Sequence, residues 1–183
     1  MEYMQQNLRV IDPLYGILKP LDVMQPYRLE MATKHVFPDK STKLSDWWKP
    51  CITASLGKDL EARSNKMLLN LASDEYSVAV ESSELPEGTR YIKVVFWEEG
   101  RAIAVHAKKA RGMMVRFIAE NNVQDVAGVQ GFDKEGYSFL KEQSDATTLV
   151  FDRTKQASVK KPHATKGKAS LSEPSKKKAR SKK

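Results

Sequence analysis

The segment "HAKKARGMMVRFIAENN", residues 106–122, has the spacing of an amphipathic helix. Residues at intervals of three and four along it form one stripe, about 100° wide, that would face a core. The members of this stripe are Ala110, Met113, Met114, Phe117, Ile118 and Asn121. The sequence therefore predicts a helix in this segment, and the side of the helix that carries the methionines is expected to pack against the core.

The opposite side of the predicted helix is cationic. It carries Lys108, Lys109, Gly112 and Arg116, with Arg111 at the flank. Residues 101–119 hold five basic residues and no acidic one. These charges lie in the first turns, where the helix dipole already disfavours positive charge, so a nearby anion would stabilise them.

Gly112 lies in the middle of the cationic side. A glycine inside a helix costs about 1 kcal/mol relative to alanine, which suggests that something approaches its backbone closely. A phosphate backbone and another protein segment are both candidates. Alternatively, the lysines and arginines pair with acidic side chains elsewhere in the folded body.

The net charge of +8 is unevenly distributed along the 183 residues. Residues 155–183 hold eleven basic residues and one acidic residue, whereas residues 1–154 hold twenty basic and twenty-two acidic residues. The positive charge is therefore a property of the C-terminal tail. A cationic helix is informative because the body around it is slightly acidic.

The tail, residues 155–183, has almost no large apolar side chains, so we expect it to be disordered. Its last eight residues, KKKARSKK from Lys176 to Lys183, are typical of a nuclear-localisation or nucleic-acid-binding run, which would make a nuclear-import receptor a partner. A solubilising extension is the alternative. The single cysteine and the absence of a membrane span or secretory signal predict a cytosolic protein, with nuclear entry through the tail as a second expectation.

Helix and strand patterns alternate over residues 1–154, which indicates one domain of the α/β class with mixed α+β character. A helix capped by Ser45 and a short buried strand at residues 67–72 are predicted. Residues 91–97 and 101–107 are both β-rich and are joined by Glu98-Glu99-Gly100, a hairpin signal. A last strand is expected at residues 147–151. We therefore expect a largely antiparallel sheet with packed helices.

Two glycines follow the basic helix in "VQDVAGVQGFDKEGY", residues 123–137. Helix-hairpin-helix modules use an apolar-Gly-apolar turn so that bare backbone N–H groups can approach a DNA phosphate. Gly128 and Gly131 are candidates for such a turn. The alternative is an ordinary loop that uses glycine for its backbone freedom.

Asp74 and Glu75 form a candidate polar site because they follow the predicted strand at residues 67–72. A helix cap at Ser73 or Asp74 is the alternative. His35, His106 and His163 lack the spacing of metal ligands, and His106 is expected on a strand. Cys51 is expected in the core. We predict no metal site and no cofactor, because no phosphate-binding, dinucleotide or zinc signature occurs.

Four blocks together resemble the YaaA peroxide-stress family over about residues 3–153. They are "LYGILKPLDVMQPYRLEM" at residues 14–31, "NLASDEY" at 70–76, "AKKARGMMVRFIAEN" at 107–121 and "GFDKEGYSF" at 131–139. The order and spacing of the blocks also agree. Four long blocks in order make the resemblance specific.

The resemblance implies a DNA-binding protein linked to the hydroperoxide response and to recombination-type DNA repair. It also implies an α/β fold with a positively charged cleft and a helix-hairpin-helix element. Lys108, Lys109, Arg111 and Arg116 fall in one matching block and are expected to face DNA. Lys19 and Arg28 fall in another and join the expected DNA-binding set.

Two features depart from the family pattern. Members of the family are typically longer and open with a strand that carries an "ISPAKTL"-like motif, so this chain is expected to be an N-terminally truncated form. The missing part would contribute strands and cleft residues, and could carry an organellar targeting segment. The Lys-rich tail is foreign to the compact bacterial pattern and suggests a eukaryotic relative.

The leading hypothesis is a noncatalytic protein that binds duplex or branched DNA without strong sequence specificity. The second is an enzyme that acts on a nucleic-acid or nucleotide substrate in the cleft, with Asp74 or Glu75 as acid/base or metal ligand and lysines holding phosphate. The third is a protein-interaction module whose tail serves as an import signal.

Overall fold

A four-stranded sheet forms the centre of the computed structural model, which describes residues 1–34, 36–39 and 42–154. Its strands lie in the order β3 (Met67–Asn70), β4 (Arg90–Glu98), β6 (Thr148–Arg153) and β5 (Ser138–Phe139). The β3–β4 and β4–β6 pairs are parallel, and only β5–β6 is antiparallel. The α/β class is confirmed. The expectation of a largely antiparallel sheet is wrong for these four strands.

The parallel pairing follows from what comes after β4. The chain turns at Glu99 and Gly100, both at positive φ, but pairs back only at the single bridge between Glu98 and Arg101. It then enters α4 (Ala104–Glu120), so the predicted strand at residues 101–107 is wrong. A helix that crosses back over the sheet lets the next long strand run parallel to the first.

The first core lies between the sheet and α4. Burial alternates along β4, with Ile92, Val94 and Phe96 buried on the side that faces the helix. Ala107, Ala110 and Met114 of α4 meet them, and Met113, Phe117 and Ile118 pack around this contact. The predicted apolar stripe is therefore confirmed. Phe151 of β6 and Phe132 after α5 (Val126–Gln130) complete this aromatic-rich core.

The second core is built by α2 (Leu44–Glu61) against the hairpin of β1 (Val10–Asp12) and β2 (Gly16–Leu18). The helix buries Ile52, Leu56 and Leu60, whereas Cys51 falls on its exposed side, so its expected core position is wrong. The predicted Ser45 cap is also wrong. Ser45 lies inside the helix and Lys43 occupies the N-cap.

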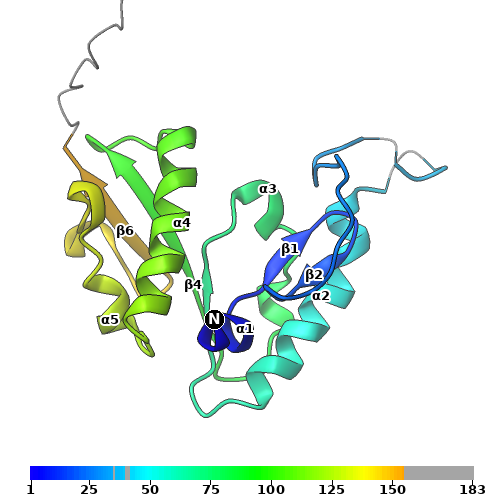
Figure 1. Cartoon of the computed structure of the whole chain (residues 1–183), viewed down its shortest axis with the longest axis horizontal. Helices are drawn as coiled ribbons and strands as arrows, with labels where there is room; N and C mark the ends of the chain where they lie inside the picture. Colours follow the sequence, from blue (N-terminus) through cyan, green and yellow to red (C-terminus); the bar gives the residue numbers. More distant parts are fainter. Residues whose placement is uncertain (35, 40–41, 155–183) are drawn as a thin grey trace, which may run out of the picture.

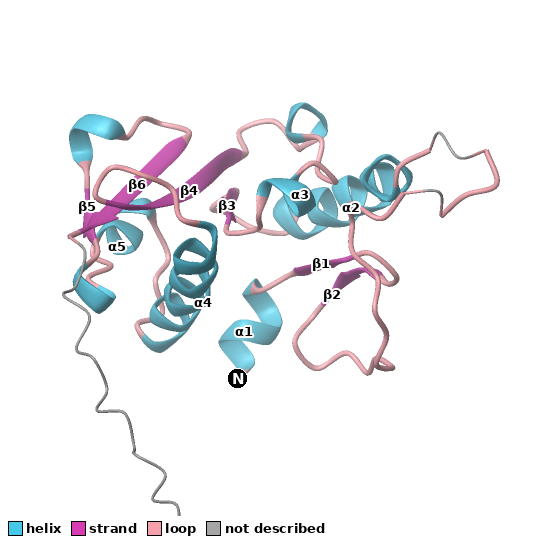
Figure 2. Cartoon of the chain, turned by 90° about the horizontal axis from the view of Figure 1, so that it is seen from above, coloured by secondary structure: helices cyan, strands magenta, loops and turns pink. Residues whose placement is uncertain are grey.

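The two cores lie on two arms of the molecule, with α4, α5 and β6 on one arm and α2, β1 and β2 on the other (Figure 1). The short helix α1 (Glu2–Asn7) lies between the arms in both views (Figures 1 and 2), whereas α3 (Asp74–Ser77) lies beside α2 in Figure 2, with Tyr76 packed against the second core. Single 3₁₀ turns occur at Ser82–Glu84, Lys134–Gly136 and Lys141–Gln143. The tail and two of the three histidines, His35 and His163, lie outside the described residues.

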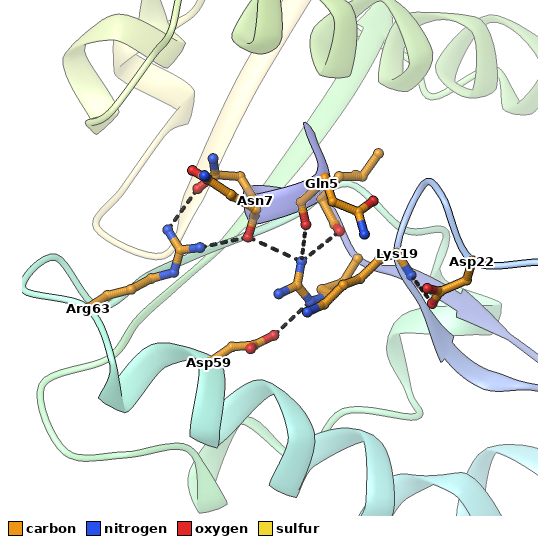
Figure 3. Close-up of polar contacts among 9 residues, drawn as sticks. Gln5, Asn7, Lys19, Asp22, Asp59 and Arg63 are labelled. Carbon is orange, nitrogen blue, oxygen red and sulfur yellow. Dashed lines mark hydrogen bonds and ion pairs between the residues drawn. The ribbon is translucent and has the colours of Figure 1, made fainter. Parts of the chain in front are cut away.

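Two arginines hold α1 against α2. Arg9 pairs with Asp59 of α2 at 2.7 Å and donates to backbone carbonyls at the end of α1. Arg63 donates to the Asn7 side chain and to the Gln6 carbonyl oxygen, both at 2.7 Å (Figure 3). The last carbonyls of a helix have no partner within it, so these guanidinium groups satisfy them.

The β1–β2 hairpin depends on Gly16. Its φ is +76°, and a Cβ built there would lie 2.7 Å from two ring carbons of Trp48. The indole is itself fixed, because its Nε1–H donates to the Pro13 carbonyl oxygen at 3.0 Å. The hairpin therefore packs on α2 only with a glycine at this position.

We predict that Gly16→Ala lowers the free energy of unfolding by about 2–4 kcal/mol, because it combines left-handed backbone strain with overpacking. Gly88→Ala is the matched control, since Gly88 has φ +79° and nothing within 4 Å of its built Cβ. The control should lose only about 1 kcal/mol. Urea denaturation measures both losses. Equal losses would contradict a role for the Trp48 contact.

Candidate nucleic-acid interface

The outward side of α4 carries the predicted cations, but they are not equivalent. Lys108 and Gly112 are exposed, and a Cβ built on Gly112 would meet nothing within 4 Å. The space beside this glycine is therefore open in the structure, and no protein segment of the described chain occupies it. Among the described residues, no ion pair is formed by Lys108.

Two of the predicted cations are paired with carboxylates. Lys109 pairs with Glu135, and Arg116 Nε lies 2.6 Å from Glu120 Oε1, one turn further along the helix. The alternative that these charges pair within the folded body therefore holds for half of the set. Both basic side chains remain well exposed, at 61% for Lys109 and 79% for Arg116. Exposed pairs of this kind contribute little to stability and can exchange partners.

Arg111 faces the loop that follows β3. It is half-buried, and its Nε is buried without a hydrogen-bond partner in the described part of the chain. Lys93 of β4 reaches Asp74, the first residue of α3 after this loop, where its Nζ lies 2.7 Å from Asp74 Oδ1. Lys93 first, and Arg111 after it, hold the pKa of Asp74 below its ordinary value. Side chains from α3, β4 and α4 therefore converge at one point.

The candidate polar site does not have acid/base geometry. Asp74 is 81% exposed, and its pKa is lowered, whereas a carboxyl group that serves as a general acid or base works best with a pKa raised towards the operating pH. Glu75 turns away to accept a hydrogen bond from the Ala32 backbone N–H at 3.0 Å. No group of three or more His, Cys, Asp or Glu side chains is arranged to hold a metal ion in residues 1–34, 36–39 and 42–154.

A buried ion network lies at the carboxyl end of β4 and β6, beneath the first turns of α4. Arg153 Nη2 lies 2.7 Å from Glu98 Oε2, and its Nη1 lies 3.2 Å from Glu135 Oε2. His106 Nδ1 lies 2.8 Å from Glu98 Oε2. His106 thus belongs to α4, and its expected place on a strand is wrong. Lys109 joins the network through Glu135.

Glu98 is the centre of this network and is only 5% exposed. Burial alone would raise its pKa, but the contacts with Arg153 and His106 outweigh burial, so the pKa lies below its ordinary value. Lys109 likewise lowers the pKa of Glu135. Sequence patterns missed this network. The residues in each of its contacting pairs are 8 to 55 positions apart along the chain, and no local sequence pattern marks them.

The glycines after α4 do not form the predicted turn between two helices. Gly128 lies inside α5, where its N–H donates to the Asp125 side chain at 2.8 Å, and a Cβ there would lie 2.7 Å from Val123 Cγ1. Gly131 follows α5, and its N–H donates to the Gly128 carbonyl oxygen. Neither N–H is available to a phosphate. The glycines serve close packing and helix capping instead.

The two remaining candidates lie on the other arm. Lys19 follows β2 and is exposed, and its backbone N–H donates to the Asp22 side chain (Figure 3). Arg28 is exposed in the chain between β2 and α2. Strand β2, which Lys19 follows, lies on the arm opposite to α4 in Figure 1. Both candidates can extend a basic surface across the molecule, but they do not form one cluster with Lys108 and Arg111.

We predict that acid weakens the fold through Glu98. Its folded pKa is depressed, so its ionised form contributes stability above the unfolded value of about 4.3, and this contribution is lost as the pH falls through the folded pKa. Glu98→Gln should therefore be much less stable than wild type at pH 7, with the difference narrowing below about pH 4. Thermal melts at several pH values measure this difference.

The control for this experiment is Glu99→Gln, which removes the neighbouring exposed carboxylate. It should track the wild-type melting temperature at every pH. A stability difference between wild type and Glu98→Gln that stays constant from pH 7 to pH 3 would contradict the ion network as its source.

Comparison with known proteins assigns the chain to a family. A family profile described as "Peroxide stress protein YaaA" matches residues 1–143. UPF0246 proteins of Aliivibrio fischeri strain MJ11 and of Alteromonas mediterranea are each 45% identical to this chain, over 157 and 158 residues. The matches cover 85% of this chain and 60% of each relative, so the chain spans less than two thirds of their length. The chain belongs to the peroxide stress protein YaaA family.

Proposed function

We propose that this protein binds DNA, duplex or branched, in the response to hydroperoxide. The observation that carries the proposal is the pair of cations on α4, Lys108 and Arg111, that form no ion pair with any carboxylate of the described chain. The family's peroxide-stress description supports the biological setting. The DNA-binding step rests on the charges of α4.

Lys108 and Arg111 would contact phosphates first. They lie in the first half of α4, where the helix dipole adds positive potential to their own charge. Arg111 is half-buried, so a phosphate oxygen would bind the side of its guanidinium group that faces solvent and not the buried Nε. Gly112 beside them leaves the backbone accessible, since no atom lies within 4 Å of its built Cβ.

Lys109 and Arg116 would join by exchange of partners. Arg116 contacts the exposed Glu120, and Lys109, itself 61% exposed, contacts the half-buried Glu135; ion pairs made by exposed cations are weak in water. A phosphate can replace the carboxylate without uncovering a buried charge. The α4 face would thereby present four cations to DNA, whereas in the absence of DNA two of these four are paired with carboxylates.

Weak sequence specificity follows from the kind of contact. Lysine and arginine bound to phosphates set the position of a protein on DNA but read no base. The basic tail would add further electrostatic affinity without sequence preference. Binding of this type weakens steeply with salt, because each neutralised phosphate releases counterions.

We predict that replacing Lys108 and Arg111 together by alanine flattens the salt dependence of DNA binding. The slope of log K against log salt concentration should change by about 0.9 for each lost phosphate contact, or about 1.8 for both. Fluorescence anisotropy with a labelled duplex and a four-way junction, at several salt concentrations, measures the slope. The titration is repeated on a protein without residues 155–183, so that the tail does not mask the helix.

The matched control replaces Lys58 of α2 and Lys141 by alanine, which removes the same charge from exposed positions away from α4. It should leave the slope nearly unchanged. Equal slopes for both double variants would show that only net charge matters, and would overturn the assignment of the interface to α4.

We also predict that Glu120→Gln strengthens DNA binding. The substitution frees Arg116 from the one ion pair that it forms within residues 1–34, 36–39 and 42–154, and it removes a negative charge from the same face. An exposed pair contributes about 0.2–1 kcal/mol, so affinity should rise by up to roughly five-fold at low salt. The same anisotropy titration measures it. Glu61→Gln at the end of α2 is the control, and an equal gain there would contradict a local effect.

A further inference from the structure

The outward side of α2 carries apolar side chains that remain exposed in the described chain. The helix buries Ile52, Leu56 and Leu60 in the second core, and its opposite side faces solvent. The exposed apolar members of that side are Trp47, Pro50, Cys51 and Ala54. They occupy positions i, i+3, i+4 and i+7, so they lie along one side of the helix. We call this surface the α2 stripe.

Trp47 is the largest member of the α2 stripe. Its ring packs against Phe37 with the ring centroids 5.0 Å apart, yet 58% of the residue remains exposed. The neighbouring Trp48 differs, because it packs on Gly16 and donates its indole N–H to the Pro13 carbonyl oxygen. A large aromatic side chain that stays exposed beside other apolar residues is typical of a protein–protein contact surface.

Four charged residues flank the α2 stripe, and their order makes this surface complementary to itself. Lys43, Asp46, Lys58 and Glu61 are all exposed, and none of them forms an ion pair within residues 1–34, 36–39 and 42–154. Lys43 and Glu61 lie nine residues on either side of Ile52. Asp46 and Lys58 lie six residues on either side of the same position. Opposite charges are therefore placed symmetrically about the middle of α2.

Two copies of α2 bring these opposite charges together in antiparallel order but not in parallel order. A parallel pair would place Lys43 beside Lys43 and Glu61 beside Glu61. With a two-fold axis at Ile52, Lys43 of one copy meets Glu61 of the other, and Asp46 of one copy meets Lys58 of the other. The symmetry repeats each contact, so the charges fix both the direction and the register of the pair.

We infer that the α2 stripe is a homodimer interface, occupied by a second copy of this chain with its α2 antiparallel to the first. The contact is isologous, so the same side chains serve both subunits. A helix of 18 residues is about 27 Å long, and a contact confined to it is smaller than the roughly 800 Å² per partner of a stable complex. The dimer should therefore be weak and dissociate in the micromolar range.

The dimer leaves the proposed DNA interface free. Helix α2 lies on the arm opposite to α4 (Figure 1), and no residue of the α4 face takes part in the α2 contact. The inference is therefore independent of the proposed DNA binding. At nanomolar protein the dimer dissociates, so Lys58 and Glu61 remain valid control positions for DNA titrations at that concentration.

Exchange of the charges at the two ends of α2 tests the register in the full 183-residue protein. Sedimentation velocity over the micromolar range, without nucleic acid, should show a monomer–dimer equilibrium for the wild type. Lys43→Glu and Glu61→Lys should each weaken the dimer by about ten-fold, because each replaces two attractive contacts by two repulsive ones. The double variant restores opposite charges and should recover the wild-type dissociation constant.

The charge variants are expected to fold. Lys43 is the N-cap of α2, and Glu61 is its last residue. An acidic residue at the start of a helix and a basic residue at its end both agree with the helix dipole, so each substitution favours the helix. A melting temperature at or above that of the wild type verifies folding for each variant.

Trp47→Ser tests the apolar part of the contact and should weaken the dimer by about ten-fold or more. Val105→Ser is its control, because Val105 is 68% exposed but lies on α4, and it should leave the dimer unchanged. Cys51 is the single cysteine and adjoins Ile52, so the two thiols of a dimer come close to the two-fold axis. A short bismaleimide should therefore link two wild-type chains efficiently and link far fewer chains of Trp47→Ser.

Four results would overturn the inference. A wild-type protein that stays monomeric throughout the micromolar range has no such interface. A dimer that Trp47→Ser leaves intact, or that the bismaleimide does not link, uses another surface. A double charge variant as weak as the single variants would exclude the antiparallel register. A monomer whose Cys51 resists a maleimide would make another segment of the chain, such as residues 155–183, the occupant of the α2 stripe.

Discussion

The contact between α4 and the buried side of β4 is the constraint on which the rest of this structure depends. The helix places Ala107, Ala110 and Met114 on Ile92, Val94 and Phe96, and this contact buries its apolar stripe. Once the stripe faces inward, the lysines and arginines between its members must face outward. The same contact makes α4 a crossover, which sets β6 parallel to β4.

The crossover also explains the buried carboxylate. The carboxyl ends of β4 and β6 meet at one edge of the sheet, so Glu98 and Arg153 become neighbours although they are 55 residues apart. A buried charge is costly unless it is paired, and Glu98 is paired with Arg153 and His106. Glu135 binds the other terminal nitrogen of Arg153 and also pairs with Lys109, which connects Lys109 to the network. The arrangement of the strands therefore helps to determine that Lys109 is one of the paired cations of α4.

The periodicity of apolar residues in the sequence predicted part of this structure but not all of it. The stripe of α4 and the short strand at β3 follow from local patterns, which the structure confirms. Residues 101–107 were wrongly predicted as a strand, because Ile103 and Val105 suit a strand, whereas packing of Ala107 and Ala110 favours the helix that begins at Ala104. The pairing of Lys109 with Glu135 and the effect of Arg111 on Asp74 depend on segments that only the fold brings together. No spacing in the sequence encodes such contacts.

The alternate packing of β3 has a consequence for how the molecule unfolds. Leu68 belongs to one core and Leu69 to the other, so four residues of chain tie both hydrophobic clusters to one backbone register. A slip by a single residue would exchange these leucines between the clusters and damage both at once. The two arms are therefore thermodynamically coupled, and melting of either arm withdraws support from its neighbour in one cooperative transition.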